Sequence, residues 1–213
     1  ADICFTSTMI PNMIADISTH NRVISYVGCL TQMSFFSLFG CMDDMLLTVM
    51  AYDRFLAICH PLHYVVIMNP RLCVSLLLLC VFISLLDSQL HNLVALQFTC
   101  FRDVEIANFF CHPTQLLSLS CSDTLIKNLV TYLVGAILGF FPMLGILFSY
   151  CKIVSTVLKI PSSVGRYKAF STCSSHLSVV CLFYGSGVGV YLASAVSFSP
   201  RKGMVASLMY TVV

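Results

Sequence analysis

Charged residues are scarce in this chain, and one adjacent pair of them stands at the end of a long apolar segment. Only 9% of the 213 residues are charged and 58% are hydrophobic, whereas charged residues make up about 25% of soluble domains. Asp53 and Arg54 follow the apolar segment Tyr26–Val49 as its first charge pair. Such a pair is costly to bury in a membrane and easily solvated, so we expect it at the interface, within reach of a partner.

Three further carboxylates, Asp2, Asp43 and Asp44, fall within apolar stretches. Each costs about 2.5–3.5 kcal/mol at the centre of a membrane helix on insertion scales, so an intramembrane acidic residue suggests a function by default. Asp44 is adjacent to Asp43 and therefore points about 100° away around a helix. We expect Asp44 to pack toward a neighbouring helix or its polar groups.

The elements that must position these residues are membrane helices. The mean hydropathy of +0.92 places the chain in the membrane class, and about 20 apolar residues cross a bilayer. Four complete spans are predicted, over Val23–Val49, over Leu72–Leu86 with a weaker continuation through Asp87–Phe98, over Leu129–Cys151, and within Ala169–Pro200. Two partial spans are predicted at Ile3–Ala15 and Met204–Val213. The predicted fold is thus an all-α transmembrane bundle forming a single domain over residues 1–213.

Polar segments separate the predicted spans. Arg54–Arg71 is expected to be a loop broken by Pro61 and Pro70, and Lys152–Lys168 is a basic turn. Thr99–Thr124 is a cysteine-bearing loop that is too polar to cross a membrane. With Arg54 on the cytoplasmic side, six basic residues fall inside and five outside, so the basic-residue rule favours this orientation only narrowly.

The 12 cysteines support the same orientation. Cys29, Cys100, Cys111 and Cys121 fall at or beyond the outer interface, an even number in an oxidising compartment. Four cysteines allow three pairings, and Cys29 at the outer end of a helix could attach the long loop to the bundle. The other eight are interpreted as small packing residues.

Several stretches resemble one family. Met50–Tyr64, MAYDRFLAICHPLHY, closely resembles the end of the third transmembrane helix of olfactory receptors, the odorant-sensing branch of the rhodopsin-like G-protein-coupled receptors. Cys111–Thr124 resembles their second extracellular loop, Ser149-Tyr150 their fifth helix, Lys168–Leu177 (KAFSTCSSHL) their sixth, and Arg201–Val213 the start of their seventh. The resemblance covers essentially the whole chain and implies a seven-helix receptor without its first helix, part of the second and the end of the seventh. It also implies the disulfides Cys29–Cys111 and Cys100–Cys121.

The resemblance also implies a coupling switch. In this receptor class the arginine of the Asp53-Arg54 pair turns toward the fifth and sixth helices on activation and helps to admit the C-terminal helix of a G protein. Tyr150 is its expected partner in that state. Some relatives lock the resting state through a carboxylate at the base of the sixth helix, where this chain has Lys168, so that lock is not expected. His176 is either part of the switch or a packing residue.

The family pattern places acidic residues like Asp2 and Asp43 around a water-filled cavity, where two hard oxygen ligands could hold Na⁺ or protons, or could solvate internal water. The expected ligand pocket lies in the outer half of the bundle, and its lining is apolar with a few hydroxyl groups, which suits a small neutral molecule. The predicted lining residues are Met33, Phe36, Ser37, Gly40, Cys41, Gly135, Leu138, Tyr184, Gly187, Val188, Tyr191, Ser207 and Thr211.

The expected protein is a multi-pass odorant receptor of the cell membrane that couples a small, mostly apolar volatile ligand to a stimulatory, olfactory-type G protein and cyclic AMP. No enzyme motif is present, no nucleic-acid partner is expected, and the only cofactor considered is Na⁺ as an allosteric ion. A metal site at Cys111-His112 would compete with the disulfide. Two alternatives remain: a non-functional receptor remnant, and an ion transporter or channel, which would predict inverted repeats or paired broken helices that the sequence lacks.

Overall fold

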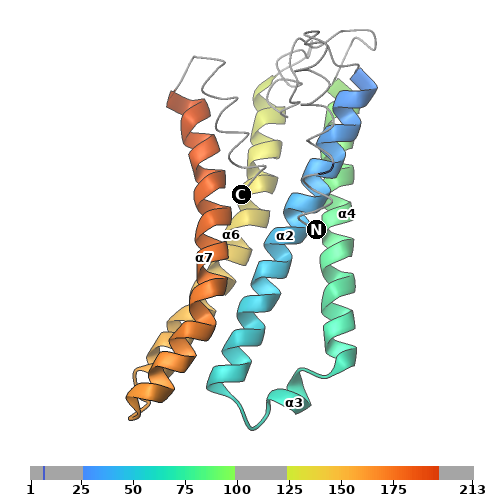
Figure 1. Cartoon of the computed structure of the whole chain (residues 1–213). Coiled ribbons are helices and arrows are strands. Elements are labelled where there is room, and N and C mark those ends of the chain that lie inside the picture. Colours follow the sequence, from blue (N-terminus) through green and yellow to red (C-terminus); the bar gives the residue numbers. More distant parts are fainter. Residues whose placement is uncertain (1–6, 8–25, 99–123, 197–213) are drawn as a thin grey trace. The chain divides into compact units, whose positions relative to one another are not determined.

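The computed structural model describes Ser7, residues 26–98 and residues 124–196 (Figure 1). Within those ranges the chain forms four long helices and one short one. They are α2 (Tyr26–Cys59), α3 (Tyr64–Ile67), α4 (Pro70–Phe98), α6 (Thr124–Val157) and α7 (Ser163–Val196). The described residues form no strand, so the predicted all-α fold is confirmed.

Helix α2 is longer than the sequence predicted. It continues ten residues beyond the expected end at Val49, so Arg54 lies on a helix and the expectation that a loop begins there is wrong. The segment from Arg54 to Cys59 contains neither Gly nor Pro and has no reason to leave the helix. The helix ends before Pro61, because proline disfavours helical geometry in the residue that precedes it.

Two other helix starts follow from local hydrogen bonding. Asn69 caps α4, since its side-chain Oδ1 accepts a hydrogen bond from the backbone N–H of Leu72 at 2.9 Å. Pro70 occupies the first helical position, where its missing N–H is not needed. At the start of α7, the hydroxyl of Ser162 accepts a hydrogen bond from the backbone N–H of Gly165 at 3.2 Å. The predicted basic turn, Lys152–Lys168, is therefore mostly helical, and only residues 158–162 lie outside α6 and α7.

Three of the described helical segments are long and apolar enough to cross a membrane: Val27–Cys59, Pro70–Leu96 and Leu133–Val157. Leu72–Leu86 and its weaker continuation are thus one helix. Helix α7 has 34 residues, like α6, but is not among these segments. The two partial spans predicted at the chain ends lie outside the described residues, apart from Ser7.

The chain divides into two compact units. The first comprises residues 1–44 and 79–140, and the second comprises residues 45–78 and 141–213. The second unit has a core of side chains from α2, α6 and α7: Leu47, Ala51, Ile146, Tyr150, Ile153, Val157, Cys173 and Val180. Helices α2 and α6 approach closely there, because a Cβ placed on Gly145 would lie 3.2 Å from Thr48 Cγ2. This core positions the polar groups described next.

Candidate functional site

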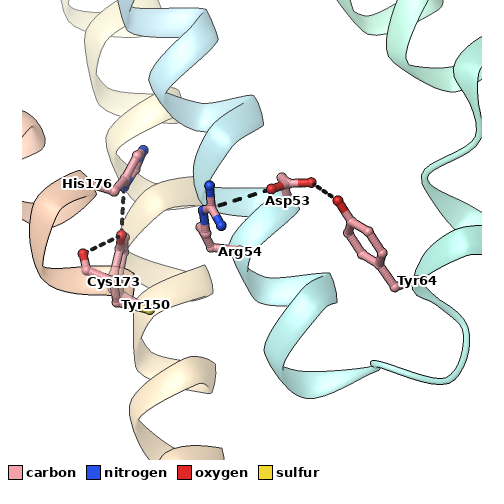
Figure 2. Close-up of polar contacts among 6 residues, drawn as sticks. All are labelled: Asp53, Arg54, Tyr64, Tyr150, Cys173 and His176. Atoms are coloured by element: carbon pink, nitrogen blue, oxygen red, sulfur yellow. Dashed lines mark hydrogen bonds and ion pairs between the residues drawn. The ribbon is translucent and has the colours of Figure 1, made fainter. Parts of the chain in front are cut away.

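The carboxylate of Asp53 has two partners in the second unit, and they bind it at different distances. Its Oδ1 accepts a hydrogen bond from the hydroxyl of Tyr64 at 2.7 Å. Its Oδ2 lies 3.9 Å from Nε of Arg54, whose side chain is 40% exposed while that of Asp53 is 24% exposed. Figure 2 shows Asp53 between these two side chains. The predicted Asp53–Arg54 pair is therefore present, and the Tyr64 hydroxyl lies closer to the Asp53 carboxylate than Arg54 does.

The segment between α2 and α4 positions Tyr64. The rings of His60 and Phe55 pack edge to face, with centroids 5.5 Å apart. The short helix α3 then begins at Tyr64, whose carbonyl accepts a hydrogen bond from the N–H of Met68 at 2.8 Å. The hydrogen bond to Asp53, and the negative charge of that carboxylate, raise the pKa of the Tyr64 phenol above its ordinary value. The sequence pattern does not indicate this contact, because it predicts a loop here.

A second polar pair joins α6 to α7. The hydroxyl of Tyr150 lies 2.6 Å from Nδ1 of His176 and 3.5 Å from the carbonyl oxygen of Cys173 (Figure 2). The two rings stack with centroids 5.7 Å apart, and both side chains are buried. The Leu47 carbonyl of α2 lies near the imidazole, but Nε2 itself makes no hydrogen bond.

Figure 2 shows Arg54 between Asp53 and the Tyr150–His176 pair. Among the described residues, the salt-bridge partner of Arg54 is Asp53. In this arrangement the Tyr150 hydroxyl is hydrogen-bonded to His176. The contact predicted for the activated state joins Tyr150 to Arg54 instead. Lys168, on α7, is exposed. The predicted residues of the switch thus lie in one unit, around the ends of three helices.

The first unit contains a polar cluster that sequence reasoning missed. Ser34 on α2 lies 2.6 Å from Oδ1 of Asn92 on α4, and the hydroxyl of Ser88 donates to the Ser34 carbonyl at 2.9 Å. Asp87 is buried and lies 3.3 Å from Nδ1 of His91. An Asp followed by a His four residues later in an apolar helix could have revealed this cluster, since ionisable residues within a span are rare.

The predicted pocket residues differ in their burial. Met33 is buried, and Phe36, Ser37, Gly40, Cys41, Leu138, Tyr184 and Gly187 are half-buried, whereas Gly135 and Val188 are exposed. The Tyr191 side chain, Ser207 and Thr211 lie outside the described residues. The residues on α2 and α6 belong to the first unit and those on α7 to the second, so the pocket stays a prediction.

The predicted ion and disulfide sites are described only in part. Asp43 is half-buried and Asp44 buried, as expected for carboxylates inside the bundle, but Asp2 lies outside the described residues. Cys29 is buried and disulfide-bonded. Cys100, Cys111 and Cys121 lie outside the described residues, so the pairing stays a prediction, as does the Na⁺ site. In the described part of the chain, no three His, Cys, Asp or Glu residues group as metal ligands would.

Comparison with known proteins identifies the family. Residues 1–203 match the model of the 7 transmembrane receptor (rhodopsin family). The whole chain is 71% identical to human Olfactory receptor 7E24 and 70% identical to mouse Olfactory receptor 7E178, and it covers 63% and 64% of those proteins. It is also 56% identical over 212 residues to human Olfactory receptor 7G3, of which it covers 68%. The chain thus spans less than two thirds of the first two relatives. It belongs to the olfactory receptors of the rhodopsin family, which are multi-pass membrane receptors rather than enzymes.

Proposed function

We propose that the receptor to which this chain belongs binds a small, mostly apolar volatile ligand and activates a stimulatory, olfactory-type G protein that raises cyclic AMP. The observation that carries this proposal is the position of Arg54. It lies near the end of α2, partly exposed, with a carboxylate at 3.9 Å on one side and the Tyr150–His176 pair on the other (Figure 2).

The ion pair can release Arg54 at low cost. A partly exposed ion pair contributes about 0–1 kcal/mol, and the 3.9 Å distance is longer than a hydrogen bond. We therefore propose that activation turns Arg54 away from Asp53 and toward α6, where the Tyr150 hydroxyl exchanges His176 for the guanidinium. That exchange separates α6 from α7 at this point and opens space for the C-terminal helix of a G protein.

The segment beside Asp53 supports a protein partner. Leu62, Val65 and Val66 are 92%, 79% and 74% exposed, and all three lie between α2 and α4 or on α3. Large aliphatic side chains concentrated on so short a connection favour contact with an apolar surface, and we propose that this surface belongs to the G protein. They lie at the same end of α2 as Arg54, so one partner could contact both.

The experiment is a comparison of Arg54→Ala with the parent in the receptor expressed from its complete coding sequence. Cells are exposed to a panel of volatile alcohols, aldehydes, ketones and esters, and cyclic AMP is measured against surface level. We expect Arg54→Ala to abolish the response while surface level is kept. Arg71→Ala, an exposed arginine at the start of α4, is the matched control and should respond like the parent.

Two results would contradict the proposal. A cyclic AMP response that survives in Arg54→Ala at equal surface level would remove Arg54 from the coupling step. A ligand-gated ion current that depends on Asp43 and is indifferent to Arg54 would favour an ion channel instead.

A further inference from the structure

Two lysines, Lys152 and Lys159, lie on one exposed face at the end of α6. The helix ends at Val157, and helical hydrogen bonding continues for one more residue, because the N–H of Leu158 donates to the Val154 carbonyl at 3.0 Å. Both lysines are exposed. Residues seven apart differ by about 20° around a helix and by about 10 Å along it. The two side chains therefore leave the same side of the chain.

Lys152 lies inside an apolar segment rather than beyond it. Leu133–Val157 is long and apolar enough to cross a membrane, and Lys152 is five residues from its end, or about 8 Å along the helix. A charge at that depth is costly unless it reaches the interface or meets an opposite charge. Its Nζ lies over the ring of Phe148, 5.5 Å from the centroid, and Phe148 is 60% exposed. The ammonium group is thus held on the outward face of α6.

No carboxylate from the same half of the chain neutralises these lysines. No Asp or Glu occurs among residues 124–213, and the salt bridges between described residues involve Asp53 and Asp87 instead. Ser155 lies between the lysines on the same face, and its short side chain turns back to donate to the Cys151 carbonyl at 2.8 Å. The two positive charges are therefore separated by a small residue and leave room for an anion.

The depth of the two lysines favours a lipid headgroup over a soluble partner. Lys152 lies within the crossing segment and Lys159 two residues beyond it, so the pair extends through the layer that headgroups occupy. Leu158, beside Lys159, is 61% exposed, and exposed apolar side chains among basic ones are typical of a membrane interface. This end of α6 lies beside the end of α2, since Thr156 Oγ1 is 3.3 Å from Cys59 Sγ. It therefore faces the leaflet on the side of Arg54.

We propose that Lys152 and Lys159 bind the headgroup of a phosphoinositide in the inner leaflet. The phosphodiester, which lies nearer the acyl chains, pairs with the deeper Lys152, and a phosphate on the inositol ring pairs with Lys159. Ile153 and Val157, next to this face, belong to the core that α6 shares with α2, so the bound lipid stabilises that contact. The inference uses the same membrane orientation as the proposed function but not the role of Arg54 in coupling.

The test measures binding of phosphatidylinositol 4,5-bisphosphate, with a fluorescent acyl chain, to the purified complete receptor in detergent micelles by fluorescence anisotropy. Lys152→Gln and Lys159→Gln should each weaken binding about fivefold, the contribution of one basic residue near an anionic lipid surface. Lys152→Arg keeps the charge and should bind like the parent. Arg71→Gln is the matched control, because it removes one exposed positive charge at the start of α4, away from this face of α6, and should also bind like the parent.

Three results would overturn the proposal. Equal weakening by Arg71→Gln and Lys152→Gln would mean that the lipid responds to total charge rather than to this pair. Displacement of the labelled lipid by phosphatidylserine as effective as by unlabelled phosphoinositide, at equal negative charge, would mean that no phosphoinositide site exists. Lysine variants that bind lipid like the parent but no longer accelerate nucleotide exchange would assign the two lysines to the G protein instead.

A second measurement checks folding and binding together. The melting temperature of the parent should rise as unlabelled phosphatidylinositol 4,5-bisphosphate is added, because a ligand that binds the folded state stabilises it. The rise should be smaller when Lys152→Gln and Lys159→Gln are combined, while the melting temperature without lipid stays that of the parent. An equal rise in both proteins would contradict the site. Neither measurement uses signalling, so an Arg54→Ala receptor that signals normally would refute the proposed function and leave this inference intact.

Discussion

Replacing His176 by Phe should raise signalling in the absence of any ligand. In the structure His176 Nδ1 holds the Tyr150 hydroxyl at 2.6 Å, and in the proposed switch that hydroxyl must be released before it can bind Arg54. His176→Phe removes the nitrogen but keeps a ring that can stack on Tyr150, as the imidazole does at 5.7 Å. The substitution therefore weakens the resting arrangement without touching the proposed active one.

The size of the effect follows from the hydrogen bond that is lost. Hydrogen bonds between membrane helices average about 0.6 kcal/mol and reach about 1.7 kcal/mol, and about 1.36 kcal/mol corresponds to a factor of ten. The ratio of active to resting receptor should thus rise about three- to eighteen-fold.

The assay measures the cyclic AMP level in the absence of ligand and divides it by the amount of receptor at the cell surface. Ser178→Ala is the control, because Ser178 is an exposed residue of the same helix whose hydroxyl donates to the Ser174 carbonyl at 2.9 Å. Basal signalling that stays the same or falls in His176→Phe, with surface level retained, would refute the role of this hydrogen bond in the resting state and leave His176 as a packing residue.

Two further predictions concern stability rather than signalling. Asn92→Ala removes the side chain that lies 2.6 Å from Ser34 Oγ, so it should lower the free energy of unfolding in detergent by about 0.6 kcal/mol and by no more than about 1.7 kcal/mol; a melting temperature equal to that of the parent would contradict this interhelical contact. Cys29→Ser breaks the disulfide of a buried cysteine and should keep the receptor away from the cell surface, because the loss of a native disulfide costs about 2–5 kcal/mol. Normal surface labelling of Cys29→Ser would show that the disulfide is dispensable for folding.

The sequence predicted the helices well because membrane spans are set by length and hydropathy. Leu129–Cys151 lies wholly within α6, and the turn around Pro161 separates α6 from α7. The ends were less predictable. Arg54–Cys59 is polar at its start, so hydropathy alone assigned it to a loop, yet a helix can leave the apolar layer and continue in water until Pro61 stops it.

The site was only partly predictable for a different reason. Arg54, Tyr150 and His176 could be found because the motifs around them resemble those of a known family. Tyr64 and Asn92 could not, since their importance depends on the side chain opposite them, Asp53 or Ser34, and such pairings depend on how helices and loops pack. Hydropathy likewise indicates that a residue lies in a span without indicating which helix it will face.

The central claim is that this receptor activates a G protein through Arg54. The most direct measurement is the rate of nucleotide exchange on a purified stimulatory heterotrimer, mixed with the complete receptor in lipid nanodiscs and the volatile panel. We predict that the parent accelerates exchange with at least one compound and that Arg54→Ala does not. Equal acceleration by both proteins, or exchange that the parent never accelerates, would contradict the account.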